Sequence, residues 1–84
     1  RKEDYTDREI QDAAAGITIY YATDPESKIQ ADFIKEKPHV LVTPYDTNAY
    51  PNVEESKPGY CVIKLYRNDG TETTGNVNIS VSGY

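Results

Sequence analysis

Acidic side chains are the most numerous groups in this 84-residue chain that could take part in catalysis. Two carboxyl groups about 5–9 Å apart across a cleft hydrolyse glycosidic bonds when one of them is held protonated. The candidates are Glu54, Glu55, Asp24, Asp32, Asp46 and Asp69. The adjacent pair Glu54 and Glu55 stands in residues 54–59, where lysine, proline and glycine predict a solvated turn. We therefore expect no enzyme activity.

The other reactive groups are few. His39 is the only histidine, and its place at the start of a strand predicts an ordinary hydrogen-bonding role, although histidine titrates near neutral pH. Cys61 is the only cysteine, which excludes an intrachain disulfide, and its strand position predicts a buried, inert thiol. Asp46 and Asn48 have the first spacing of a calcium loop, but the later ligands are missing. We expect no metal and no cofactor.

Residues suited to binding are better represented than residues suited to catalysis. The chain has eight tyrosines, one phenylalanine and no tryptophan, a composition found at contact surfaces and equally in half-buried strands. Rings beside amides and a guanidinium suit sugar hydroxyls or a polar protein epitope. A long connection is predicted at residues 44–59, and Asn68-Asp69-Gly70 predicts a chain reversal. The candidate receptor-binding residues in and beside these two segments are Asp46, Asn48, Tyr50, Asn52, Arg67, Asn68 and Asp69.

The net charge of −5 argues against nucleic acid and against anionic membrane surfaces as partners. No apolar run approaches the roughly 18 residues that a membrane-spanning helix needs, so we expect no membrane insertion. Methionine is absent, and residues 1–4 are a charged run typical of the end of a linker or stalk. We therefore expect the chain to be part of a longer protein.

Residues 5–16 predict a short helix. Thr6 and Glu9 have the spacing of a capping box, Ala13 to Ala15 favour helix, and Gly16 is placed to end it. This helix is too short to hold by itself and would need to dock on other residues. We accordingly divide the chain into residues 1–16, a linker with a helix, and residues 17–84, a β module.

The β module shows alternating or continuous apolar runs separated by turn residues. Strands are predicted at 17–21 and 28–33, which we expect to pair as a hairpin, and then at 39–43, 60–67 and 77–82. A sixth, short edge strand is predicted within 48–53. Since no helix separates these strands, a parallel sheet is not expected. The fold predicted is an all-β, small antiparallel β-sandwich of about six strands.

Some of these strands are apolar on both sides. A sandwich of five or six short strands encloses one core, so the apolar residues on the second faces need another partner. These residues are Tyr20, Leu41, Val62 and Tyr66. We expect them to form a subunit interface in a homo-oligomer.

The order of elements is similar to that of a known family. An alternating strand ends in Phe33, a charged link leads to Pro38, an apolar strand closes on Thr43-Pro44, and Gly59-Tyr60 opens the strand before the final strand. This pattern resembles the carboxyl-terminal receptor-binding modules of phage tail fibres, and more loosely the H-type lectin domain, over residues 28–84. The resemblance implies a six-stranded antiparallel β-sandwich that assembles as a trimer and binds host-surface glycans or proteins. The tryptophan, histidine and arginine sugar site of those lectins has no counterpart here.

Taken together, these features predict a noncatalytic, homotrimeric module at the tip of a tail fibre, extracellular on the virion, that attaches to a host-surface glycan or protein. Two alternatives stay open. One is a structural module that trimerises or caps a fibre. The other is a capsid decoration or baseplate module that binds other virion proteins.

Overall fold

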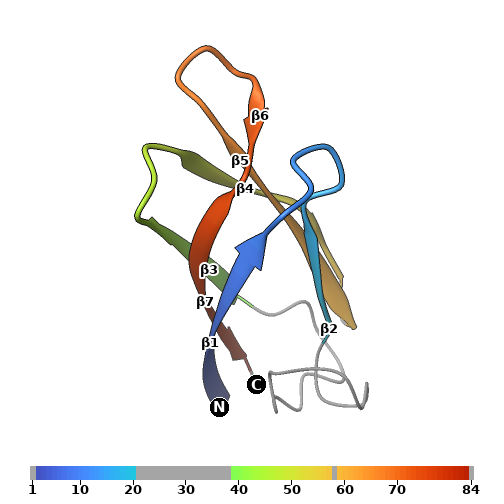
Figure 1. Cartoon of the computed structure of the whole chain (residues 1–84). Helices are drawn as coiled ribbons and strands as arrows, with labels where there is room; N and C mark the ends of the chain where they lie inside the picture. Colours follow the sequence, from blue (N-terminus) through green and yellow to red (C-terminus); the bar gives the residue numbers. More distant parts are fainter. Residues whose placement is uncertain (1, 21–38, 58, 84) are drawn as a thin grey trace.

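The computed structural model describes residues 2–20, 39–57 and 59–83. Strands are the only regular secondary structure among these residues (Figure 1). The strands are β1 (Lys2–Ile10), β2 (Ile17–Tyr20), β3 (His39–Tyr45), β4 (Tyr50–Ser56), β5 (Tyr60–Tyr66), β6 (Glu72–Thr73) and β7 (Gly75–Gly83). Every pairing between them is antiparallel. The predicted all-β, antiparallel architecture is confirmed.

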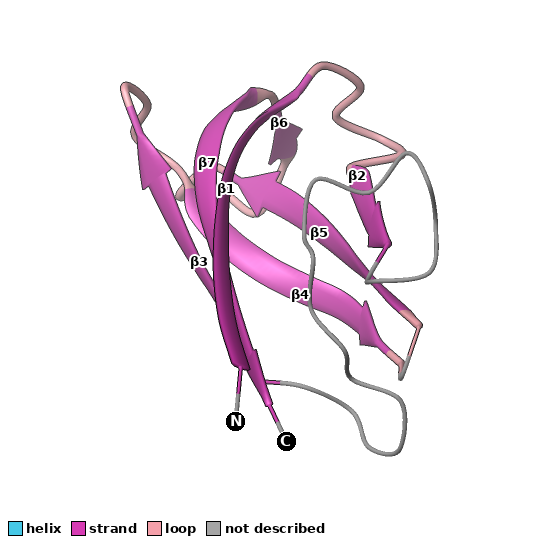
Figure 2. Cartoon of the chain, turned by 90° about the horizontal axis from the view of Figure 1, so that it is seen from below, coloured by secondary structure: helices cyan, strands magenta, loops and turns pink. Residues whose placement is uncertain are grey.

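The strands form two sheets that lie against each other as layers (Figure 2). In sheet A, β7 is central and pairs with β1 on one side and β3 on the other. In sheet B, β5 is central. Leu65 of β5 lies opposite both Pro51 and Thr73, so β4 and β6 pair with opposite edges of β5, and β2 continues the β6 side.

The core lies between the two central strands. Cys61, Ile63 and Leu65 of β5 are fully buried on one side, and the alternate residues of β7 are fully buried on the other. Alternation places all inward side chains of a strand on one face, so these two strands face each other through their apolar sides. The buried set is Ile10, Ile19, Cys61, Ile63, Leu65, Val77, Ile79 and Val81. Each large member contributes about 1.5–3 kcal/mol by leaving water.

Two prolines lie within strands rather than at strand boundaries. We expected Pro44 to end its strand, but β3 continues to Tyr45, and Pro51 is the second residue of β4. Both strands lie at the edge of their sheets among the described residues. A proline has no N–H to donate, and an edge strand leaves one side of its backbone without a strand partner, so proline is tolerated there.

The predicted helix at residues 5–16 is wrong. Residues 2–10 form β1, which pairs with β7 along its whole length, so they are part of the sandwich and not a linker. Residues 13–15 form only a turn, in which Oδ1 of Asp12 accepts hydrogen bonds from the backbone N–H groups of Ala14 and Ala15 at 3.0 and 3.2 Å. Helix propensity is a weak preference, and the pairing of β1 with β7 outweighs it. No helix long and apolar enough to cross a membrane occurs in the part of the chain that the structure describes.

Only the first strand of the hairpin predicted between residues 17–21 and 28–33 is described by the structure. The strand β2 pairs with β5, with Ile17 opposite Ile63 and Ile19 opposite Cys61. Residues 28–33 lie outside the described residues. The predicted hairpin therefore stays a prediction.

Gly16 supports a prediction about stability. Its φ is +68°, and an added Cβ would lie 2.3 Å from the backbone oxygen of Ile63. Gly70 also has a positive φ, of +86°, but nothing lies within 4 Å of its added Cβ. We expect Gly70→Ala to lower the free energy of unfolding by about 1–2 kcal/mol through backbone strain alone. Gly16→Ala should cost clearly more, because strain and overlap add.

The measurement is chemical denaturation followed by circular dichroism. Gly59→Ala is the matched control, since its added Cβ meets nothing within 4 Å and its φ is not positive. We expect it to change the free energy of unfolding by less than about 0.5 kcal/mol. Equal losses in Gly16→Ala and Gly70→Ala would contradict the close approach of residue 16 to β5.

Candidate binding site

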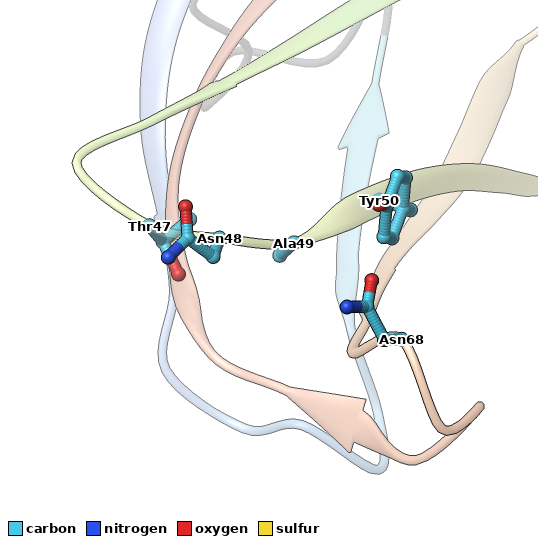
Figure 3. Close-up of a pocket in the computed structure, with 5 residues that line it drawn as sticks. All are labelled: Thr47, Asn48, Ala49, Tyr50 and Asn68. Atoms are coloured by element: carbon cyan, nitrogen blue, oxygen red, sulfur yellow. The ribbon is translucent and has the colours of Figure 1, made fainter.

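Two loops at one end of the sandwich form a recess of about 360 Å³. We call it the loop recess, and it is lined by Thr47, Asn48, Ala49, Tyr50 and Asn68 (Figure 3). The first four residues come from the connection between β3 and β4 and the start of β4, and Asn68 comes from the turn after β5. The structure thus brings together three of the predicted receptor-binding residues from two separate segments.

The turn that carries Asn68 is held by its own hydrogen bonds. Thr71 donates from its backbone N–H and its hydroxyl to Oδ1 of Asp69, at 3.0 and 2.6 Å. These bonds lower the pKa of Asp69 from its ordinary value. The guanidinium of Arg67 donates to the hydroxyl of Thr71 and to the backbone oxygen of Glu72, at 3.2 and 3.1 Å. Asn68 is therefore presented on a turn that is ordered without any ligand.

The loop between β3 and β4 is positioned by backbone geometry. Asp46 has a φ of +58°, a left-handed conformation that aspartate tolerates better than most residues. The next residue, Thr47, packs against Gly75 so closely that a Cβ there would lie 2.9 Å from its methyl group. Because residue 75 is a glycine without a side chain, the loop can pack against β7.

The loop recess offers one aromatic ring and two amides. The Tyr50 side chain is 60% exposed, so the ring is available to stack on a ligand. Asn48 and Asn68 each carry groups that donate and accept hydrogen bonds, which is the requirement for recognising hydroxyl groups. In Figure 3 the amide of Asn68 lies next to the ring of Tyr50. The lining has no charged side chain, so a neutral polar ligand suits it best.

The remaining predicted receptor-binding residues lie elsewhere or are already engaged. Asn52 is on the outer face of sheet B, where its amide donates to Glu54. Arg67 and Asp69 hold the turn, and Asp46 sets the loop conformation. Two lining residues were missed, Thr47 and Ala49. Both residues are sequence neighbours of predicted binding residues, which could have indicated that they line the same site. Neither residue type by itself suggests binding.

The predicted interface residues lie on two opposite surfaces. Tyr20, Val62 and Tyr66 occupy the outer face of sheet B, because their strand neighbours Cys61 and Leu65 point into the core. Leu41 lies on the outer face of sheet A and is 67% exposed. There it shares a register row with Ser80 and Tyr5, which is 64% exposed.

The outer face of sheet B contains an ordered set of tyrosine and glutamate side chains. We expected residues 54–59 to form a turn, but Glu54 and Glu55 belong to β4. The hydroxyl of Tyr66 donates to Oε1 of Glu54 at 2.8 Å, and the hydroxyl of Tyr60 donates to Oε2 of Glu55 at 3.2 Å. Hydrogen bonds from Asn52 and from Tyr66 lower the pKa of Glu54. The charge of Glu55 raises the pKa of Tyr60.

The single histidine and the single cysteine have the positions that the sequence predicted. His39 is exposed at the start of β3. Cys61 is fully buried between the sheets. Across the described residues, no three or more histidine, cysteine, aspartate or glutamate side chains are grouped as metal ligands would be.

Comparison with protein-family models, with curated proteins and with solved structures gave no match to this chain. The tail-fibre resemblance therefore stays a prediction from the residue pattern.

The hydrogen bond between Tyr66 and Glu54 predicts a pH effect. Because the folded-state pKa of Glu54 is lowered, its contribution to stability is present above the unfolded value and is lost as the pH falls through the folded value. Tyr66→Phe removes one donor, so we expect the pKa of Glu54 to rise toward its ordinary value and the acid-induced loss of stability to shrink. Carboxyl chemical shifts followed by NMR titration measure the change.

Tyr60→Phe is the matched control for this titration. Its hydroxyl donates to Glu55 and not to Glu54, so the pKa of Glu54 should stay where it is in the unaltered protein. A titration curve of Glu54 that is the same in Tyr66→Phe and in the unaltered protein would show that the hydrogen bond does not hold the carboxylate.

Proposed function

We propose that this chain is a noncatalytic attachment module that binds a neutral glycan or a polar protein surface through the loop recess. The observation that carries this proposal is the convergence of Tyr50, Asn48 and Asn68 from two segments into one recess. Loops at one end of a rigid sandwich are common positions for binding residues. Both loops are held by contacts that do not involve a ligand, so little ordering is needed on binding.

The absence of charge in the recess supports binding rather than catalysis. Its lining residues supply two amides, a hydroxyl, a methyl group and a phenol, with no carboxylate, imidazole or thiol among them. Acid–base or nucleophilic catalysis needs a group with a matched pKa next to the bond that reacts. An aromatic ring and two amides in one recess instead match the alternating apolar and hydroxyl surfaces of a sugar.

The setting that we propose is the tip of a phage tail fibre, extracellular on the virion. The support for it is the residue pattern over residues 28–84, together with a two-sheet antiparallel fold of the kind that the resemblance implies. In this setting the ligand is a host-surface glycan or protein. A module that only trimerises or caps a fibre would have no use for the recess.

Attachment is tested with Tyr50→Ala. We expect binding of neutral glycans, measured on a glycan panel and by amide chemical shifts of Asn48 and Asn68, to weaken by about tenfold or more, since a stacked ring supplies much of the contact. Tyr20→Ala is the control, because Tyr20 is also an exposed tyrosine, at 48% against 60% for Tyr50, but lies opposite Tyr60 and outside both the recess and sheet A. Equal binding by both variants, or shifts far from the two loops, would remove the recess from the site.

Self-association is also part of the proposal, and we place it on the outer face of sheet A, where Leu41 and Tyr5 are the most exposed large apolar residues. The two outer faces of a sandwich point in opposite directions. Contacts through both faces would stack copies into an open filament instead of closing a ring. One closed assembly therefore uses one of the two faces.

Two aspartate variants separate the faces. We expect Leu41→Asp to reduce the molar mass in solution to that of one chain, because it places a charge in the contact. Val62→Asp, on the outer face of sheet B, should leave the mass unchanged. Light scattering coupled to size-exclusion chromatography measures both. Dissociation by Val62→Asp alone would move the interface to sheet B.

A further inference from the structure

The outer face of sheet B carries three tyrosine rings that the loop recess does not use. Tyr20 and Tyr60 lie opposite each other in the register of β2 and β5, with ring centroids 6.1 Å apart and tilted by 43°. Tyr66 lies further along the same face of β5. Tyr20 is 48% exposed, and Tyr60 and Tyr66 are half-buried.

A β-bulge adds two carboxylates to the same face. The register of β4 against β5 shifts between Val53 and Glu55, so Val53 is opposite Ile63 and Glu55 is opposite Val62. In a regular strand Glu54 and Glu55 would point to opposite sides, but the extra residue of a bulge breaks that alternation. Both carboxylates are exposed, and each accepts a hydrogen bond from a tyrosine of β5. We call Tyr20, Tyr60, Tyr66, Glu54 and Glu55 the tyrosine–glutamate face.

The charges of this face do not balance. Lys64, the cation of the outer face of β5, forms its ion pair with Glu72. After the hydrogen bonds from Asn52 and Tyr66, the charge of Lys64 also contributes to the lowered pKa of Glu54. Among the residues that the structure describes, neither Glu54 nor Glu55 forms an ion pair. Both exposed carboxylates therefore have neutral hydrogen-bond donors. Tyr66 and Asn52 donate to Glu54, and Tyr60 donates to Glu55.

We propose that the tyrosine–glutamate face binds an arginine-bearing segment of a partner protein. A guanidinium is planar, stacks on aromatic rings and donates two parallel hydrogen bonds to a carboxylate, and this face offers both kinds of contact side by side. A lysine ammonium is more strongly hydrated and gains less from the rings. The face would thus discriminate between the two cations and not merely attract positive charge.

A second copy of this chain is a poorer occupant. If the face packed against the same face of a second copy, two sets of the same carboxylates would meet in one interface. Like charges placed together cost on the order of several kcal/mol. The partner is therefore a different, basic surface. None of the five residues of the tyrosine–glutamate face lines the loop recess, but Tyr66 lies opposite Tyr50 in the register of β4 and β5, so the two surfaces adjoin.

The test uses a blocked peptide of alternating glycine and arginine, because alternate side chains of an extended segment point to one side. The matched probe has lysine in place of arginine. We expect the arginine peptide to shift the amide signals of Tyr20, Tyr60 and Val62, and to bind at least about threefold more tightly than the lysine peptide. Equal affinity for both peptides, or shifts centred on Tyr5 and Leu41, would overturn the proposal.

Paired charge removals provide the decisive control. Glu54→Gln with Glu55→Gln keeps acceptors for both tyrosine hydroxyls and should weaken arginine-peptide binding by about tenfold or more. Asp7→Asn with Glu9→Gln removes the same number of charges from the outer face of sheet A and should weaken it by less than about twofold. Equal weakening by the two double variants would reduce the effect to net charge and overturn the proposal. Asn68→Ala should bind the peptide normally, which separates this result from failure of the attachment proposal.

Discussion

The contact between β5 and β7 is the interaction on which the rest of the structure depends. Each strand places three consecutive alternate residues in full burial, and together they supply six of the eight buried residues of the core. Each is also the central strand of its sheet, so every other described strand is held by pairing with one of them. Among the described residues, only two other apolar residues, Ile10 and Ile19, are buried, and the single cysteine of the 84-residue chain excludes an intrachain disulfide. The edge strands are therefore free to carry polar residues and prolines.

The two proposed binding surfaces follow from how the edges attach to this centre. The loop recess forms where the connection from sheet A to sheet B passes the turn that follows β5. The tyrosine–glutamate face forms because β4 pairs with β5 through a bulge, which releases Glu54 and Glu55 to the same side. In both places the core-facing residues set the framework, and the outward residues are left for contact with other molecules.

The two surfaces differ in the chemistry that they offer. The loop recess is neutral and presents amides beside one ring, whereas the tyrosine–glutamate face is anionic and presents carboxylates among rings. The two surfaces adjoin where Tyr50 lies opposite Tyr66, so a neutral polar ligand and a basic protein segment would bind by different contacts but close together. Such a division suits a module that attaches to a surface at one end and to a neighbouring protein on its side.

The sequence by itself determined the all-β class, the burial of Cys61 and the reversal at Asn68-Asp69-Gly70, because alternation and turn chemistry are local properties of the chain. It also placed Asn48, Tyr50 and Asn68 among the binding candidates. Only the tertiary structure decided that residues 2–10 are a strand, since pairing with β7 outweighs a capping pattern that favours helix. Only the tertiary structure placed the predicted interface residue Leu41 on sheet A and the other three, Tyr20, Val62 and Tyr66, on sheet B. Register and bulges are set by contacts between distant segments, and no local pattern encodes them.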